Sequence, residues 1–238
     1  MIYLFTLLLA FCSIVYELLL AQTLATTMGN TVLRYSTTIG FYLFALGLGA
    51  LSYQRKKPTE LFPRLVRIEL SLSTIGALSP TLVLAFDMLV HKVAGATGLP
   101  YRGWLLQSGI WIFNYGLIVA IGWLSGIELP LLMDLGNQQK KGLGNRVLVV
   151  DYIGTLAGSV LFPLLLLPVF GLFFVAHLVG FLNVFVAVIV LMFYVEKRTT
   201  RFQSYLAIGL SILLLAMVLN SQRISSFVIH TMYLGGGA

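Results

Sequence analysis

Charged side chains are scarce in this sequence. Asp, Glu, Lys and Arg together supply 10% of the 238 residues, whereas apolar residues supply 59%. A soluble domain usually carries about 25% charged residues, so the composition excludes a water-soluble protein. The mean hydropathy of +0.97 indicates a chain that lies almost entirely within a membrane.

Cysteine and histidine are also rare. The single Cys12 lies inside an apolar run, which excludes a disulfide scaffold. Because the 3 histidines do not recur with each other or with cysteine at ligand spacing, we expect no metal site and no cofactor. The string ALGLGA at 45–50 lacks the preceding strand and third glycine of a dinucleotide fingerprint. The basic residues form short clusters between apolar stretches, which argues against a nucleic-acid partner.

Several apolar stretches are long enough to cross a bilayer, which needs roughly 20 apolar residues in a helix. The predicted fold class is therefore an all-α membrane protein, a polytopic bundle of about seven transmembrane helices. We place the spans at about 2–26, 35–53, 66–90, 104–133, 147–168, 171–194 and 203–221. Pro163 and Pro168 predict a kink in the fifth span, and Gly171 permits a tight turn into the sixth. We expect a membrane domain over 1–222 and a short tail over 223–238, with no soluble domain.

Lys and Arg are distributed unequally between the two sets of loops. The loops after the second, fourth and sixth spans hold 11 of them, and the opposite side holds 4, namely Arg34, Lys92, Arg102 and Arg223. Because cytoplasmic loops carry the excess of basic residues, we expect a cytoplasmic N-terminus. The odd number of spans then predicts an external C-terminus.

Acidic residues within the spans are the main chemical signal. An ionisable group at the bilayer centre costs about 2.5–3.5 kcal/mol on insertion scales. We therefore expect each such residue to have a structural or functional role. Glu17 lies deep in the first span, with Tyr16 and Gln22 nearby on the same helix. Glu69, Glu128 and Asp151 lie on the cytoplasmic halves of the third, fourth and fifth spans.

Two interpretations of these acids stay open. In the first they are structural, and fasten helices together through hydrogen bonds or through ion pairs with Arg67 and Arg146. In the second they form an acidic vestibule for an organic cation. The scarcity of intramembrane Lys and Arg favours a cation, since the charge must otherwise be balanced by protonation.

Small residues predict where helices approach closely. The second span contains Gly40, Gly47 and Gly49, and the fifth contains Gly154 and Gly158 at small-xxx-small spacing. Such residues let helix backbones pack at short distance in membranes. We interpret them as packing positions.

Several strings together resemble a known family. They are YELLLAQTLATTMGNTVLRYSTTIG at 16–40, ALGLGA at 45–50, ELP at 128–130 and DYIGTLAGSVLFPLLLLPVFGL at 151–172, followed by Asn183. The combination resembles the N-terminal transmembrane region of bacterial membrane-bound polyamine aminopropyltransferases, the spermidine synthase family. The resemblance implies a location in the bacterial inner membrane. In that family, about seven helices precede a soluble Rossmann-like domain that transfers an aminopropyl group to a diamine.

The resemblance does not extend to catalysis. The glycine-rich nucleotide loop and paired acids of the catalytic domain are absent from these 238 residues, so no catalytic residue is assigned and enzyme activity is left open. The matching membrane positions are Tyr16, Glu17, Glu128, Pro130, Asp151, Tyr152 and Asn183. An external C-terminus would also separate a following catalytic domain from its cytoplasmic donor.

The leading functional hypothesis is a membrane domain that binds or conducts polyamines through intramembrane carboxylates. The candidate ligand-binding residues are Glu17, Tyr16, Gln22, Glu69, Glu128, Asp151, Tyr152 and Asn183. Two alternatives are a non-catalytic anchor or assembly subunit for a separate enzyme, and a small proton-coupled transporter. The expected partners are the lipid bilayer, a polyamine, and a second copy of the chain or a soluble enzyme.

Overall fold

The computed structural model describes residues 1–55, 60–98, 100–101, 103–140, 142–194 and 201–226, and all regular structure in these ranges is helical. The elements in chain order are α1 (Ile2–Met28), α2 (Thr31–Arg55), α3 (Leu61–Thr97), α4 (Trp104–Gln139), α5 (Leu143–Leu161), a π-helical turn η1 (Phe162–Leu166), α6 (Leu167–Phe170), α7 (Leu172–Tyr194) and α8 (Arg201–Leu219). The predicted all-α class is confirmed.

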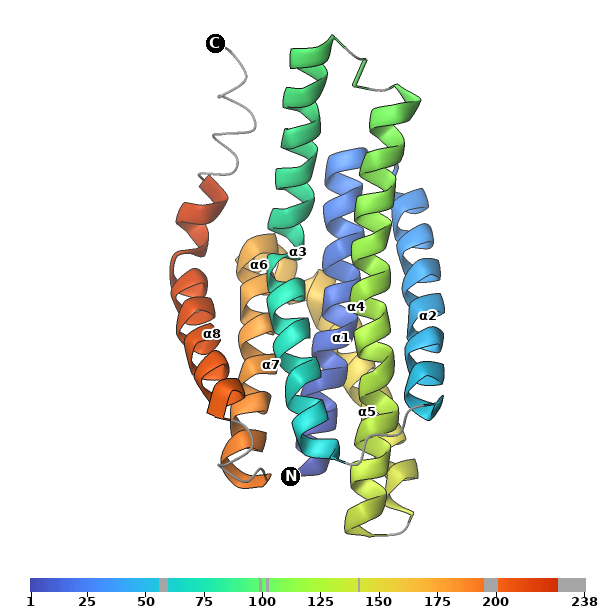
Figure 1. Ribbon diagram of the computed structural model, residues 1–238, viewed down its shortest axis with the longest axis vertical. Helices are drawn as coiled ribbons and strands as arrows, with labels where there is room; N and C mark the ends of the chain where they lie inside the picture. The colour runs from blue at the N-terminus through green and yellow to red at the C-terminus, as the bar shows by residue number, and fades with distance from the viewer. Residues whose placement is uncertain (56–59, 99, 102, 141, 195–200, 227–238) are drawn as a thin grey trace.

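Seven of the helical segments described are long and apolar enough to cross a bilayer. One of them, Leu143–Phe170, comprises α5, η1 and α6. The predicted spans fall on these segments, but α3, with 37 residues, extends beyond both predicted ends, and α4, with 36, extends beyond its predicted C-terminal end. Hydropathy detects the apolar part of a helix, whereas backbone hydrogen bonding continues into its polar ends. Figure 1 shows the upper ends of α3 and α4 standing above those of α1 and α2.

The helix α1 occupies the centre of the bundle and packs against α2, α3, α4, α5 and α7. In Figure 1, α2 and α4 lie to one side of α1, and α3, α7 and α8 lie to the other. The chain alternates in direction from one span to the next, beginning at the lower end of the view. A helix that packs on every side needs apolar residues around its whole circumference. The sequence of α1 is accordingly a nearly continuous apolar run.

The fifth span changes its helical form at Pro163. A proline has no N–H to donate and its ring clashes with the preceding turn, and here the α-helix gives way to η1 between Leu161 and Leu167. Gly171 then adopts a φ of 78°, a left-handed conformation that glycine accommodates without steric cost. The sixth span, α7, starts at the next residue, so the predicted tight turn is present. The predicted hairpin packing is wrong, because α7 packs mainly against α3, α8 and α1 rather than against α5.

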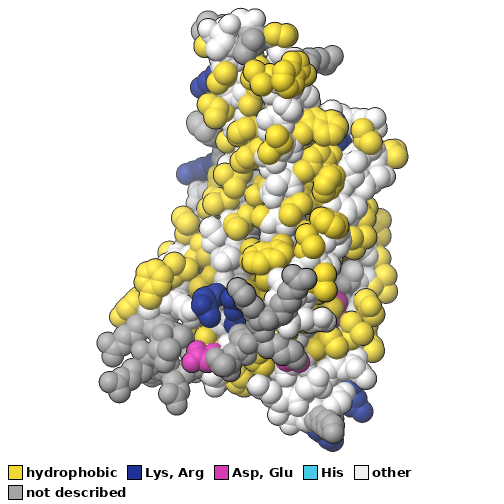
Figure 2. Space-filling model, turned by 45° about the vertical axis from the view of Figure 1, so that its right-hand side comes forward, with side chains coloured by type: hydrophobic (Ala, Val, Ile, Leu, Met, Phe, Trp, Pro, Cys, Tyr) yellow, Lys and Arg dark blue, Asp and Glu magenta, His cyan; other side chains and the backbone are white. Residues whose placement is uncertain are grey.

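Two of the predicted small-residue positions do not serve packing within the chain. Side-chain atoms added at Gly49, Gly154 and Gly158 would collide with neighbouring helices, whereas Gly40 and Gly47 have nothing within 4 Å. Gly40 and Gly47 instead lie on the face of α2 that forms part of the outer surface of the bundle. Figure 2 shows that apolar side chains cover much of this surface, as expected where the solvent is lipid.

The orientation of the chain in the membrane stays a prediction. Several basic residues that support it, including Lys56, Lys57, Arg102, Lys141, Lys197 and Arg198, lie outside the described residues, as does 227–238 of the predicted tail. The described basic residues Arg64, Arg67, Lys140 and Arg146 lie near the end of the bundle at which α1 begins.

Candidate functional site: an acidic cleft between α2 and α5

A cleft of about 270 Å³ lies between α2 and α5, with α1 and α4 forming its walls. Glu17, Glu128 and Asp151 all line it, although they belong to three different helices. Leu43 of α2 and Tyr152 of α5 also line it, and these side chains are 57% and 65% exposed. The cleft is therefore bounded at its rim by residues of the outer surface of the bundle.

Helix contacts place the three acids in a row along the bundle axis. Gly154 of α5 packs beside Leu7 and Ala10 of α1, so Asp151 lies roughly 5 Å below the level of Ala10 at about 1.5 Å per residue. Tyr42 of α2 donates to Ser125 of α4 and also bonds with Ser13 of α1. Ser125 and Ser13 therefore lie at the same height in the bundle. Glu128 lies about one turn below Ser125 on α4, and Ala10 lies about one turn below Ser13 on α1, so Glu128 is level with Ala10.

Glu17 occupies the upper end of the row. It lies seven residues beyond Ala10 on α1, or roughly 10 Å higher along the helix axis. The backbone positions of Glu17 and Asp151 are therefore about 15 Å apart along the axis, with Glu128 between them. Glu128 and Asp151 are close enough for their charges to interact. The cleft is consequently elongated and acidic along its length.

The three carboxyl groups have no counter-ion within the described residues. Glu17 and Glu128 are only 5% and 4% exposed, and Asp151 is half-buried. None of the hydrogen bonds or ion pairs in the described part of the chain involves these carboxyl groups. Arg67, a proposed structural partner, instead donates from Nε to the carbonyl of Pro63 at 3.4 Å. The ion pairs of the structural interpretation are thus not formed among the described residues.

A cluster of hydroxyl groups forms one wall of the cleft. The Tyr42 hydroxyl lies 3.0 Å from Ser125 Oγ, 2.9 Å from Ser13 Oγ and 3.1 Å from the Ser13 carbonyl. Tyr42 lies within electrostatic range of both Glu17 and Glu128. These hydroxyls and Thr155 offer oxygen acceptors in addition to the carboxylates. Ser13, Tyr42, Ser125 and Thr155 are not among the predicted site residues. Within one helix, the nearness of Ser13 to Glu17, of Ser125 to Glu128 and of Thr155 to Asp151 in the sequence could have indicated three of them.

The other predicted site residues divide between the cleft and the interior. Tyr152 lines the cleft with the three acids. Gln22 lies elsewhere and accepts a hydrogen bond of 2.6 Å from Tyr35. Tyr16, Glu69 and Asn183 are fully buried away from the cleft lining. The structure thus brings together four of the eight predicted residues.

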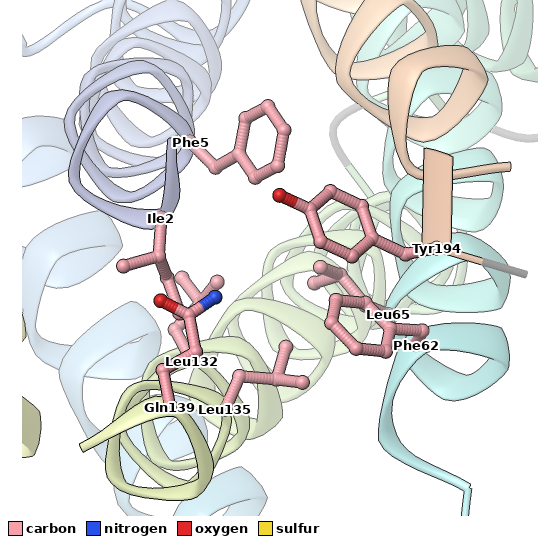
Figure 3. Close-up of a pocket in the computed structure, with 8 residues that line it drawn as sticks. All are labelled: Ile2, Phe5, Phe62, Leu65, Leu132, Leu135, Gln139 and Tyr194. Carbon is pink, nitrogen blue, oxygen red and sulfur yellow. The ribbon is translucent and has the colours of Figure 1, made fainter. Parts of the chain in front are cut away.

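A second hollow, at the lower end of the bundle, is too small for an organic ligand. Its volume is about 10 Å³, close to the space of a single water molecule. Figure 3 shows its lining, which comes from α1, α3, α4 and α7 and includes the stacked rings of Phe62 and Tyr194 at 4.7 Å. Two further hollows of about 310 and 300 Å³ have no carboxyl group among the described residues that line them. We place the candidate site in the acidic cleft because three intramembrane acids line it. Among the described residues, no group of three or more His, Cys, Asp and Glu could hold a metal ion.

The fold and the cleft define a multi-pass membrane protein whose bundle contains acids that have no partner among the described residues. Comparison with known proteins finds several that are similar to this chain in sequence. The polyamine aminopropyltransferase of Leptospira interrogans is 33% identical over 190 residues, which cover 78% of this chain and 34% of the relative. The polyamine aminopropyltransferase of Oceanobacillus iheyensis is 32% identical over 210 residues, covering 86% of this chain and 38% of the relative. Polyamine aminopropyltransferase 2 of Aquifex aeolicus is 31% identical over 221 residues, covering 91% and 40%.

The chain is homologous to the N-terminal part of polyamine aminopropyltransferases. It spans about one third of the length of the curated relatives it matches. No protein-family model matches the chain, and no solved structure matches it.

Proposed function

We propose that the acidic cleft binds a polyamine, with Glu17, Glu128 and Asp151 as its receptor. The observation that carries this proposal is the convergence of three unpaired carboxyl groups on one elongated cleft. Leaving a buried carboxylate without a partner is costly. A ligand that brings several positive charges removes this cost at each acid.

The shape of the cleft favours a linear polycation. Its acids are spread over about 15 Å along the bundle axis, so a compact monovalent cation would pair with one of them only. A polyamine carries ammonium groups at intervals along a flexible chain and can pair with successive acids. The hydroxyls of Ser13, Tyr42 and Ser125 supply further acceptors for the N–H groups of such a ligand.

Homology supports the same ligand class. The relatives are named polyamine aminopropyltransferases, and this chain corresponds to their N-terminal part. A membrane region that binds polyamines would hold substrate or product of such an enzyme near the membrane. Aminopropyl transfer itself is not assigned to these 238 residues.

Spermidine binding to the purified protein tests the proposal. A charge-assisted hydrogen bond contributes about 1.5–3 kcal/mol, so Glu17→Gln or Asp151→Asn should each weaken binding about 10- to 100-fold. The double variant should bind below detection. Glu60→Gln is the matched control, because Glu60 is an exposed carboxylate preceding α3.

Two results would contradict the proposal in different ways. If the wild-type protein binds no spermidine, the ligand class is wrong and the role of a membrane anchor or assembly subunit gains support. If it binds spermidine and all variants bind equally well, a polyamine site exists but the three acids do not form it.

A further inference from the structure

A second group of buried polar side chains lies on the opposite side of α1 from the cleft. Glu69 of α3, Tyr16 of α1 and His177 of α7 are 0% exposed, and Asn183 of α7 is 1% exposed. Both carboxyl oxygens of Glu69, the Tyr16 hydroxyl, both ring nitrogens of His177 and Oδ1 of Asn183 have no hydrogen-bond partner among the described residues. Buried polar groups are nearly always satisfied in proteins, so this concentration requires an explanation.

Contacts between α1, α3 and α7 place these groups close together. The Tyr16 ring packs directly on Gly76 of α3, and the Cys12 thiol donates to the carbonyl of Val179 on α7 at 3.8 Å. Gly180 packs against Ser73 and Ala77. Because α3 and α7 run in opposite directions, Glu69 and Asn183 both lie about one turn below this contact.

Glu69 is the critical member of the group, because no positive charge in the described part of the chain neutralises it. The titratable groups that face it are Cys12 and Tyr16 on α1, Glu128 on α4 and, higher on α7, His177. On α8, the described tyrosine Tyr205 is 74% exposed and faces away from the interior. An ionised carboxylate in such surroundings is far less favourable than a neutral one. A proton is also the one cation that needs no cavity.

Glu128 connects this interior group to the cleft. It lines the cleft and is also close enough to Glu69 for the two charges to interact. We propose that Glu69 is a proton-binding site that exchanges its proton with the cleft through Glu128. Binding of a polyamine, which rests on the proposed function, would then release a proton, because the positive charges of the ligand favour the ionised form of the nearby Glu69. Glu69 donates the proton to the Glu128 carboxylate, and Glu128 releases it through the cleft to bulk solvent.

Infrared spectroscopy of the purified full chain tests the proton site without any ligand. At neutral pH the wild-type spectrum should contain protonated-carboxyl absorption, of which Glu69→Gln removes one component and Glu60→Gln removes none. Glu128→Gln should retain the Glu69 band but slow its shift on transfer to D₂O. A wild-type spectrum that Glu69→Gln leaves unchanged would overturn the proton site. An unslowed shift in Glu128→Gln would overturn the route.

Calorimetry tests the coupling to the ligand. Spermidine is titrated in two buffers of different protonation enthalpy, which gives the number of protons released per ligand bound. Release should decrease in Glu69→Gln while spermidine still binds, and should be unchanged in Glu60→Gln. Equal release by the wild type and Glu69→Gln would overturn the coupling and leave the polyamine site intact. Absence of binding by the wild type would overturn the proposed function and the coupling, while the infrared experiment would still decide the proton site.

Discussion

Gly49 and Gly47 lie two residues apart on α2 and provide a direct test of the packing that encloses the cleft. A Cβ added at Gly49 would lie 2.9 Å from the Cα of Gly126 on α4 and still closer to the Trp123 carbonyl oxygen. A Cβ added at Gly47 would meet nothing within 4 Å. Alanine at either position removes a helical glycine, which by itself stabilises a helix by roughly 0.5–1 kcal/mol.

The two substitutions therefore share this gain and differ only in the collision. Forcing an extra methyl group into a closely packed interface costs about 1–3 kcal/mol. We expect Gly49→Ala to be less stable than Gly47→Ala by about this amount, because the backbone atoms of α4 cannot rotate away as a flexible side chain would.

Reversible unfolding in mixed detergent micelles, followed by circular dichroism, measures the difference. Gly126→Ala and Gly116→Ala form a second matched pair on α4, since Gly126 contacts Leu46 and Gly116 has open space. Equal stability within both pairs would refute the close approach of α2 and α4, and with it the geometry of the cleft.

Further predictions concern the cleft, the hydrogen bonds of α3 and the orientation. Glu128→Gln should weaken spermidine binding about 10- to 100-fold, because Glu128 is the middle acid of the row; an unchanged dissociation constant would remove it from the receptor. Ser79→Ala should destabilise the protein by about 1–3 kcal/mol. The reason is that Pro80 leaves the Gly76 carbonyl without a helical donor, and the Ser79 hydroxyl donates to this carbonyl at 2.8 Å. Ser108→Ala, which removes an exposed hydrogen bond, is the control, and equal stability of the two variants would contradict the prediction. In a Cys12→Ala background, a membrane-impermeant thiol reagent should label Thr31→Cys and not Gln138→Cys on intact cells, and the reverse pattern would invert the predicted orientation.

The sequence predicts the fold class and the spans well, for a clear physical reason. A bilayer imposes a minimum apolar length on each helix, and this length can be read without knowing which helices are neighbours. Both ends of α3 and the C-terminal end of α4 could not be read in this way, because they extend beyond the apolar stretches as ordinary helices.

The site was only partly predictable. The acids stand out because a charge in a span is costly, but which acids converge depends on the faces that the helices turn toward one another. Glu69 and Glu128 are both predicted on the cytoplasmic halves of their spans, yet of these two only Glu128 lines the cleft. Tyr42, Ser13 and Ser125 contribute through contacts between three helices, which no single helix encodes.

A structure of this chain determined with bound spermidine tests the central claim most directly. The ligand should lie in the cleft between α2 and α5, with ammonium nitrogens within hydrogen-bond distance of Glu17, Glu128 and Asp151. Spermidine bound elsewhere, or a cleft that stays empty at a saturating concentration, would contradict the assignment of these carboxyl groups as a polyamine receptor.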